Sequence, residues 1–366
     1  MKTFLIFSII LFLFACTEKS KTAVNLTISY SNKYAKNIKI IKRKGFTEVQ
    51  IINPDKKQIE KKYALAKNVN ELKLNSDLIP IQIPLKSIIC LSGTDIGMLE
   101  KIKCADKITG ILNIQYVFNQ IVKNNYTQKK VKAIQDLNQI NPENLVGLAE
   151  IITYSGFGNP PNNEKKLNKL GVLCIPNYDW KEIHPLGKAE WIKFYGILFD
   201  KEKEANTYFH KIEKEFDKLS KLAKKISHKP SVLSGSMIGD SWYMPAGESY
   251  IASFFKKANC LYVNQKSKGT GSSAYTFEHI LKEFQHTEFW LNPGFKTKTE
   301  LLQANSKYQF FDAFKNDKIY CYSHNMNHFW EMSAVEPQKV LSDLLQILHS
   351  GEIPKKNLYF YRKLSD

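Results

Sequence analysis

The chain has 366 residues and carries 53 lysines and arginines against 35 aspartates and glutamates, which gives a net charge of +18. Only Arg43 and Arg362 are arginines, the residue that nucleic-acid sites prefer for bidentate contacts, so the composition argues against a nucleic-acid partner. About 350 residues follow the N-terminal apolar run, which is too many for one simple core and indicates two domains or lobes.

The N-terminus has the pattern of an export signal. Lys2 precedes an apolar run over residues 4–14, and Ala15 stands directly before Cys16. A run of about a dozen apolar residues is too short to span a bilayer, which takes roughly 20. The segment LFAC resembles the lipobox of bacterial lipoproteins, which implies that residues 1–15 are a signal peptide and that Cys16 carries a lipid. The alternative is a plain cleaved signal with an incidental cysteine; both place the mature protein outside the cytoplasm.

Strand and helix patterns then divide the chain into an extension and a first lobe. Within residues 16–77, the segments NIKIIKRKG and FTEVQIINPDKK alternate apolar and polar residues, which predicts a small N-terminal β-hairpin extension. Over residues 78–200, short apolar strands alternate with helical stretches, which predicts an α/β lobe with a mainly parallel sheet. The predicted strands lie near KSIICL, KITGI, VKAI, EIITYS and LGVLCIP.

A long amphipathic segment separates this lobe from a second one. Apolar residues recur at steps of three and four over residues 201–228, which predicts a linking helix of about 40 Å that ends before Pro230. Strand patterns resume over residues 229–350, which form the predicted second α/β lobe, and residues 351–366 form a predicted tail. The predicted fold class is therefore α/β, with two lobes joined by one long helix.

Five cysteines follow Cys16, at positions 90, 104, 174, 260 and 321. Their spacing is wide and no CxxC pair occurs, so a zinc cluster has no support in the sequence. Several lie in apolar runs, which favours buried free thiols, with one disulfide as the alternative in an oxidising compartment.

Six segments, in order along the chain, resemble the substrate-binding lipoproteins of ABC importers, in the rigid-helix class that binds iron-siderophores, haem and cobalamin. They are IPIQIPLKSIICLSGTDIGMLEKI, INPENLVGLAEIITYSGFG, HPLGKAEWIKFYGILFDKEKEANTYF, SWYMPAGESYIASFFKKANC, TFEHILKEFQHTEFWLNPG and NHFWEMSAVEPQKVLSDLLQILHSG. The resemblance covers about residues 78–350, and Cys260 stands where the family more often has glycine. It implies a periplasmic, membrane-anchored, monomeric binding protein that has no enzymatic activity or cofactor and delivers its ligand to a permease and its ATPase.

The resemblance also implies that one glutamate on each lobe docks onto basic residues of the permease. The matching positions are Glu143, in NPENL, and Glu278, in TFEHIL. Asn141 and Thr276 are predicted helix N-caps, so both glutamates fall in a first helical turn. The alternative is that each carboxylate only complements the helix dipole, for about 0.3–1 kcal/mol.

Candidate ligand contacts are expected in loops after the predicted strands, where α/β sheets place their sites. Aromatic faces there suit a large, flat or chelated ligand, although each aromatic side chain has a core position as its alternative. The candidates are Ser92, Thr94, Tyr154, Phe157, Tyr178, Trp180, Trp242, Tyr243, His324, His328 and Trp330.

His324 and His328 are four residues apart, so a helix would place both on one face, where they could hold a metal or a haem iron. Polar loop histidines beside the cleft are the alternative, because no third ligand stands at a telling spacing. Two other functions stay open. One is a chelatase-like enzyme that uses these histidines with Glu331, and the other is a receptor for a divalent metal ion.

Overall fold

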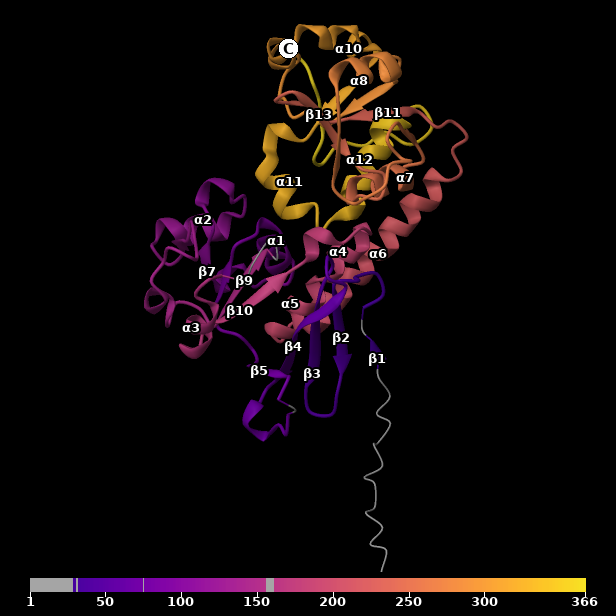
Figure 1. Cartoon of the computed structure of the whole chain (residues 1–366). Helices are drawn as coiled ribbons and strands as arrows, with labels where there is room; N and C mark the ends of the chain where they lie inside the picture. The colour runs from indigo at the N-terminus through magenta and orange to yellow at the C-terminus, as the bar shows by residue number, and fades with distance from the viewer. Residues whose placement is uncertain (1–28, 31, 75, 156–160) are drawn as a thin grey trace, which may run out of the picture.

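The computed structural model describes residues 29–30, 32–74, 76–155 and 161–366. The predicted signal peptide and Cys16 lie outside the described residues. Two α/β lobes contact α6 (Glu202–Ala223), and a separate N-terminal sheet lies below them (Figure 1). The predicted fold class is confirmed. In the described part of the chain, no helix combines the length and apolar character needed to cross a membrane.

The N-terminal extension is larger than the predicted hairpin. The hairpin strands are β2 and β3, which pair antiparallel, while β1 and β4 pair antiparallel on either side of them and β5 joins β4 in parallel. The strands are β1 (Ser29–Tyr30), β2 (Ile38–Lys42), β3 (Thr47–Asn53), β4 (Gln58–Ala66) and β5 (Ile79–Gln82). The charged first half of β4 masks its strand pattern in the sequence, because only residues from Tyr63 onward are buried.

The N-terminal lobe is built on a five-stranded sheet with the order β10-β9-β6-β7-β8, all of whose pairs are parallel. Its strands are β6 (Ile88–Cys90), β7 (Ile108–Ile111), β8 (Lys132–Ala133), β9 (Ile151–Ser155) and β10 (Leu173–Asn177). Its helices are α1 (Gly93–Lys101), α2 (Gln120–Thr127), α3 (Glu164–Lys169), α4 (Pro185–Glu190) and α5 (Ile192–Leu198). Residues in β6 are fully buried, as expected for a parallel strand covered on both faces.

The linking helix α6 has 22 residues, so it is about 33 Å long and shorter than predicted. At its C-terminal end the chain forms a tight turn, in which the N–H of Ile226 bonds to the carbonyl of Ala223, three residues back. Its apolar stripe, which includes Phe209 and Phe216, is buried against α5 and α12 (Pro337–Leu348). One helix therefore contacts both lobes along its length.

The C-terminal lobe has a main sheet with the order β14-β11-β16-β17-β18 and a small sheet with the order β12-β13-β15. The strands are β11 (Ser231–Ser234), β12 (Ser236–Ile238), β13 (Ser241–Pro245), β14 (Leu261–Tyr262), β15 (Ser272–Tyr275), β16 (Phe289–Leu291), β17 (Ile319–Cys321) and β18 (Arg362–Lys363). The remaining helices are α7 (Tyr250–Lys257), α8 (Phe277–Phe284), α9 (Lys298–Ala304), α10 (Asp312–Lys315) and α11 (Met326–Met332). Residues 351–366 are not a free tail, because β18 pairs antiparallel with β17 at the sheet edge.

The two lobes also meet through α11, which packs on α1. The Glu331 side chain is fully buried, and its carboxylate accepts hydrogen bonds from the backbone N–H groups of Phe118 and Asn119, just before α2. The carboxylate of a C-terminal helix thus satisfies two donors of the N-terminal lobe.

The five cysteines that the structure describes are all buried and form no disulfide.

Candidate functional site

The carboxyl ends of the strands in each lobe mark where a site is expected, because parallel sheets place their ligand-binding loops there. In the N-terminal lobe, Ser92 follows β6 and Asn113 follows β7. In the C-terminal lobe, Tyr322 follows β17 and leads into α11. The Asn327 side-chain amide donates to the carbonyl of Gln115 over 2.6 Å, which brings α11 against the loop after β7.

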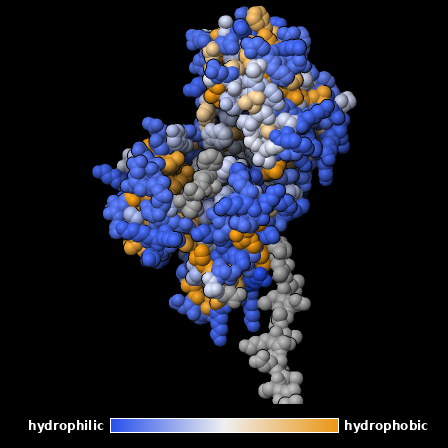
Figure 2. Space-filling view, in the orientation of Figure 1, coloured by the Kyte–Doolittle hydropathy of each residue, from blue (hydrophilic) through white to orange (hydrophobic). Residues whose placement is uncertain are grey.

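Four large apolar side chains are exposed at this junction, and we call them the cleft face. Leu112 and Tyr116 come from the loop after β7 and are 37% and 61% exposed, while Met326 and Trp330 come from α11 and are 46% and 49% exposed. Met326 and Trp330 are four residues apart and share one side of α11. In Figure 2 the surface is hollowed between the N-terminal lobe, at the left, and the C-terminal lobe, at the top.

The orientation of Trp330 is set by its neighbours. Its ring packs edge-on against Tyr322 at 5.9 Å and Phe329 at 5.5 Å between centroids. Tyr322 and Phe329 are themselves stacked at 3.7 Å. The indole therefore stands on a packed aromatic base, and an aromatic face held in this way is suited to stacking on a flat ligand.

Ser92 lines a small cavity together with two residues of the cleft face, and Thr94 lies next to Ser92. This cavity of about 40 Å³ is lined by the end of β6, the start of α1 and the loop after β7, and includes Ser92, Leu112 and Tyr116. The Ser92 hydroxyl caps α1, accepting from the N–H of Thr94 at 3.4 Å, and lies 3.0 Å from the Thr94 hydroxyl. These two predicted residues thus place hydroxyl groups beside the apolar cleft face.

Three predicted aromatic contacts lie in packed interiors instead. Tyr154 is buried in β9 with Leu167 of α3, and Tyr178 donates its hydroxyl to Glu60 in the N-terminal sheet. Trp242 is fully buried, stacks on Trp290 at 5.3 Å, and donates its indole N–H to the carbonyl of Ser234. A position near a strand end does not decide which face of the sheet a side chain occupies. These three side chains are part of the packed core.

The other predicted aromatic positions differ among themselves. Tyr243 is 41% exposed on β13, next to β12, whose last residue, Ile238, is 69% exposed. Trp180 is half-buried after β10, and the ammonium group of Lys181 lies 4.8 Å from its ring centroid. Phe157 lies outside the described residues. Of these, Tyr243 stands on a surface of the C-terminal lobe that a ligand can reach.

The histidine pair does not occupy one helix face. His324 lies in a 3-10 turn (Ser323–Asn325), and Asn325, with φ −148° and ψ 70°, interrupts the helical path before α11 begins. His328 packs between Phe118 and Phe360, with ring centroids 4.4 and 5.0 Å away, and burial lowers the pKa of both histidines. Among the residues that the structure describes, no group of three or more His, Cys, Asp or Glu could hold a metal ion.

The two predicted docking glutamates both sit in first helical turns on the surface. The Asn141 side chain accepts from the N–H of Glu143, and the Glu143 carboxylate pairs with Lys166 at 2.8 Å, which lowers its pKa. Glu278 is exposed in the first turn of α8, which Thr276 caps. The geometry leaves the dipole alternative open for both residues.

Sequence reasoning missed two residues of the cleft face, namely Leu112 and Tyr116. A signal was present, because LNIQYVFN directly follows the predicted strand KITGI and carries apolar residues in a loop. Met326 stands between the two candidate histidines and was not singled out by itself. Trp330 is the one predicted residue that belongs to the cleft face.

Asp95 and Glu331 are buried carboxyl groups close to this site. Asp95 accepts hydrogen bonds from Thr153, Asn177 and Tyr195 at 2.6 to 2.7 Å. Burial nevertheless raises the pKa of Asp95 and the pKa of Glu331 to about 7 each. Both groups therefore hold their protons at higher pH in the folded protein than in the unfolded chain.

A fall in stability with rising pH is the expected result. Because the folded state binds more protons between about pH 4 and 7, the free energy of unfolding decreases through this range and levels off above it. Urea unfolding at pH 4.5 and 8 should show that Asp95→Asn reduces this decrease by about 1–3 kcal/mol. Parallel pH profiles for the variant and the wild-type protein would contradict the assignment.

Comparison with known proteins agrees with this architecture. An uncharacterized lipoprotein of Methanocaldococcus jannaschii is 25% identical over 307 residues, which are 80% of this chain and 72% of the relative. A periplasmic heme binding protein from Pseudomonas aeruginosa is 12% identical, with a TM-score of 0.57 over 77% of this chain and 99% of its own. The periplasmic vitamin B12 binding protein of Vibrio cholerae is 14% identical, with a TM-score of 0.53 over 74% and 99%.

These two solved structures share the fold with this chain. The sequence match to a family is more direct, because residues 88–325, more than half of the chain, match the family described as periplasmic binding protein. The match begins at β6 and ends just before α11, so it takes in the sheet of the N-terminal lobe, α6 and the parallel strands of the C-terminal lobe. The chain belongs to the periplasmic binding protein family.

Proposed function

We propose that this protein is the membrane-anchored substrate-binding protein of an ABC importer, and that it binds a metal chelate in the cleft between its lobes. The lobes correspond to about residues 78–200 and 229–350, with residues 201–228 between them, and β18 completes the sheet of the second lobe. The observation that carries the proposal is the cleft face, whose exposed side chains come from the loop after β7 of one lobe and from α11 of the other, two segments that the hydrogen bond from Asn327 to Gln115 joins. Cys16 anchors the protein next to its permease, which raises its local concentration there.

The chemistry of the cleft face favours a large ligand with apolar surface. Leu112, Tyr116, Met326 and Trp330 carry no formal charge, and the hydroxyl groups of Ser92 and nearby Thr94 supply polar contacts. Such a surface suits haem, a corrinoid or an apolar iron-siderophore better than a highly anionic chelate. The heme and vitamin B12 that the similar structures bind belong to the same chemical class.

The two alternative functions, a chelatase and a receptor for a divalent metal ion, have less support than a receptor for a metal chelate. A chelatase would need a metal-handling group, and a divalent metal receptor would need three or four convergent ligands. His324 and His328 are separated by the break at Asn325, and Glu331 is turned into the contact with Phe118 and Asn119. We therefore propose binding without chemical change, with modest lobe closure because α6 contacts both lobes.

Removing the indole from the cleft face should weaken ligand binding. Trp330→Ala and Tyr116→Ala are each expected to cost about 2 kcal/mol of binding free energy, or roughly thirtyfold in Kd, because each ring contributes stacking and burial. Absorbance titration with haemin and cyanocobalamin measures the effect for whichever of the two binds. Ile59→Ala, which removes an apolar side chain that is 42% exposed on the distant strand β4, is the matched control. Equal Kd values for the three variants would place the ligand elsewhere.

Charge reversal at the docking positions should impair transport without affecting ligand binding. The Glu143→Arg and Glu278→Arg double variant is expected to reduce ligand uptake by cells roughly tenfold or more, because like charges would face each other across the permease interface. Glu283→Arg, at an exposed position one turn further along α8, is the control. Normal uptake by the double variant would leave only the dipole role for these glutamates.

A further inference from the structure

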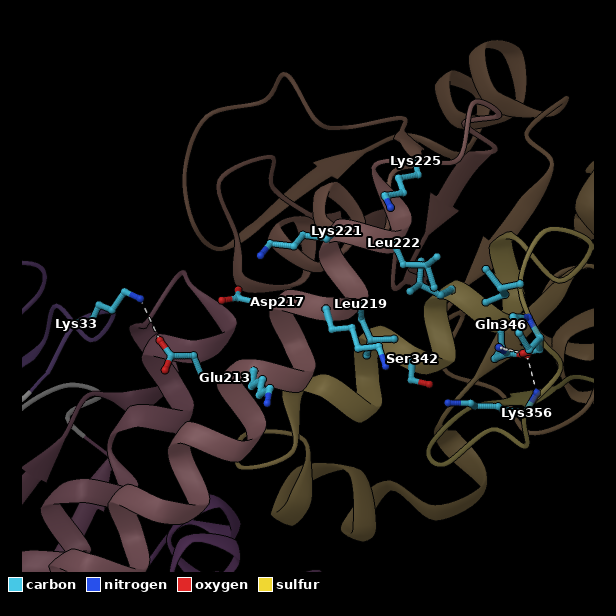
Figure 3. A pocket seen from close by; sticks show the side chains of 15 residues that line it. Lys33, Glu213, Asp217, Leu219, Lys221, Leu222, Lys225, Ser342, Gln346 and Lys356 are labelled. Atoms are coloured by element: carbon cyan, nitrogen blue, oxygen red, sulfur yellow. Dashed lines mark hydrogen bonds and ion pairs between the residues drawn. The ribbon is translucent and has the colours of Figure 1, made fainter.

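A wide groove lies along α6 and α12, in a different part of the molecule from the cleft face. Its volume is about 920 Å³, and its floor contains Leu219, Leu222 and Leu345 (Figure 3). Ile353 and Pro354 of the segment after α12 close one side. We call this the α6–α12 groove.

Lysines surround this apolar floor. The groove is lined by six lysines and by two acidic residues, Glu213 and Asp217. Glu213 is already engaged by Lys33 at 3.1 Å and by the hydroxyl of Tyr34 at 2.7 Å. The six are Lys33, Lys214, Lys218, Lys221, Lys225 and Lys356. The rim therefore has a clear excess of positive charge over a hydrophobic base.

We propose that the α6–α12 groove rests on an anionic phospholipid bilayer when the receptor is free of its permease. Lysines near an anionic membrane surface contribute about 1 kcal/mol each, and long lysine side chains can place their charges at headgroups while apolar surface meets the acyl boundary. The combination of a cationic rim and a leucine floor matches both parts of such a surface.

The beginning of the described chain supports this occupant. The first described residue, Ser29, is four residues before Lys33, which lines the groove. The chain from Cys16 to Ser29 can reach at most about 45 Å. An N-terminal lipid therefore holds the groove within reach of the bilayer, and in this respect the inference rests on the proposed function.

This orientation leaves the ligand site accessible. In Figure 1, α6 runs along the right side of the molecule, whereas α11, which carries Met326 and Trp330, lies on the left side of the C-terminal lobe. A receptor lying on α6 and α12 would present its cleft face away from the membrane. Reversible contact would then allow the receptor to turn and dock through Glu143 and Glu278.

Lysine footprinting on the full protein tests the proposal. The protein is reconstituted in vesicles of phosphatidylcholine alone or of phosphatidylcholine with phosphatidylglycerol, labelled with a water-soluble acetylating ester, and digested for mass spectrometry. A lipid anchor is present in both vesicles, so it cannot cause a difference between them. We expect the groove lysines to lose reactivity only in the anionic vesicles and to recover it in high salt. Lys130, Lys132 and Lys169, exposed in the N-terminal lobe, should keep theirs.

A triple variant extends the test. Lys218→Glu, Lys221→Glu and Lys225→Glu together should weaken binding to anionic vesicles roughly a hundredfold. The same reversal at Lys130, Lys132 and Lys169 should have little effect. Equal reactivity in the two vesicle types, or equal protection of all lysines, would overturn the proposal. If soluble polyphosphate protected the groove lysines from acetylation as well as anionic vesicles do, the groove would be a site for polyanions and not for a bilayer. None of these outcomes depends on ligand binding, so they are separate from a failure of the proposed function.

Discussion

Glu190→Ala should lower the free energy of unfolding by about 3–5 kcal/mol, because it removes a buried attachment of the N-terminal sheet. The Glu190 carboxylate is fully buried and accepts hydrogen bonds from the N–H groups of Lys33, Tyr34 and Ala35 at 2.6 to 2.9 Å. It also pairs with buried Lys193 at 2.7 Å. Alanine leaves three buried or half-buried donors without their acceptor.

Urea unfolding and limited proteolysis measure this effect. Glu202→Ala is the matched control. Glu202, at the start of α6, likewise bonds to the N-terminal sheet, because it pairs with Lys42 at 2.6 Å. Unlike Glu190, however, both side chains of this pair are 40% exposed. A surface pair of this kind contributes about 0–1 kcal/mol. Cleavage of the N-terminal segment should accelerate in Glu190→Ala only. Equal losses in the two variants would show that the buried carboxylate does not hold the sheet.

Gly97→Ala should destabilise the protein by about 3 kcal/mol and also weaken ligand binding. A Cβ atom at Gly97 of α1 would overlap the carbonyl oxygen of Glu331 and lie 2.9 Å from its carbonyl carbon. These are backbone atoms, so no side-chain rotation relieves the overlap, and α11 must move away from α1. Because α11 carries Met326 and Trp330, its displacement disturbs the cleft face as well as the core.

Gly271→Ala provides the control for this substitution, because a Cβ atom there would meet nothing within 4 Å. Thermal unfolding gives the stability change, and titration with a ligand that binds the wild-type protein gives the change in affinity. A Gly97→Ala variant with wild-type stability would mean that α1 and α11 do not pack as closely as described. Normal ligand affinity together with reduced stability would show that ligand binding at the cleft face does not depend on the contact between α1 and α11.

The large-scale architecture could be predicted from the sequence because its signals are periodic. The apolar stripe of α6 has a period close to 3.6 residues, and runs such as KSIICL are typical of strands buried on both faces. The N-terminal sheet was only partly predictable. Charged residues at the start of β4 obscure its alternation, and its pairing with β5 involves residues that lie 16 positions apart, as in Tyr63 and Ile79.

The candidate site was less predictable, because a position along the chain does not give the direction of a side chain. Trp242 and Tyr243 are adjacent in β13, yet alternate residues of a strand face opposite sides, so Trp242 is buried and Tyr243 exposed. For the histidines, the backbone of Asn325 removed the helix on which the pair depended. The contact between Gln115 and Asn327 joins the loop after β7 to α11, 212 residues further along the chain, and no local pattern reveals it.

Native mass spectrometry with absorbance, on the full mature protein released from detergent, tests the central claim most directly. The protein is mixed with a panel of ferric siderophores, haem and cobalamins, with Trp330→Ala in parallel. The account predicts one stoichiometric adduct whose ligand is chemically unchanged and which weakens in the variant. Absence of any adduct across the panel, or conversion of a ligand, would contradict a receptor for metal chelates.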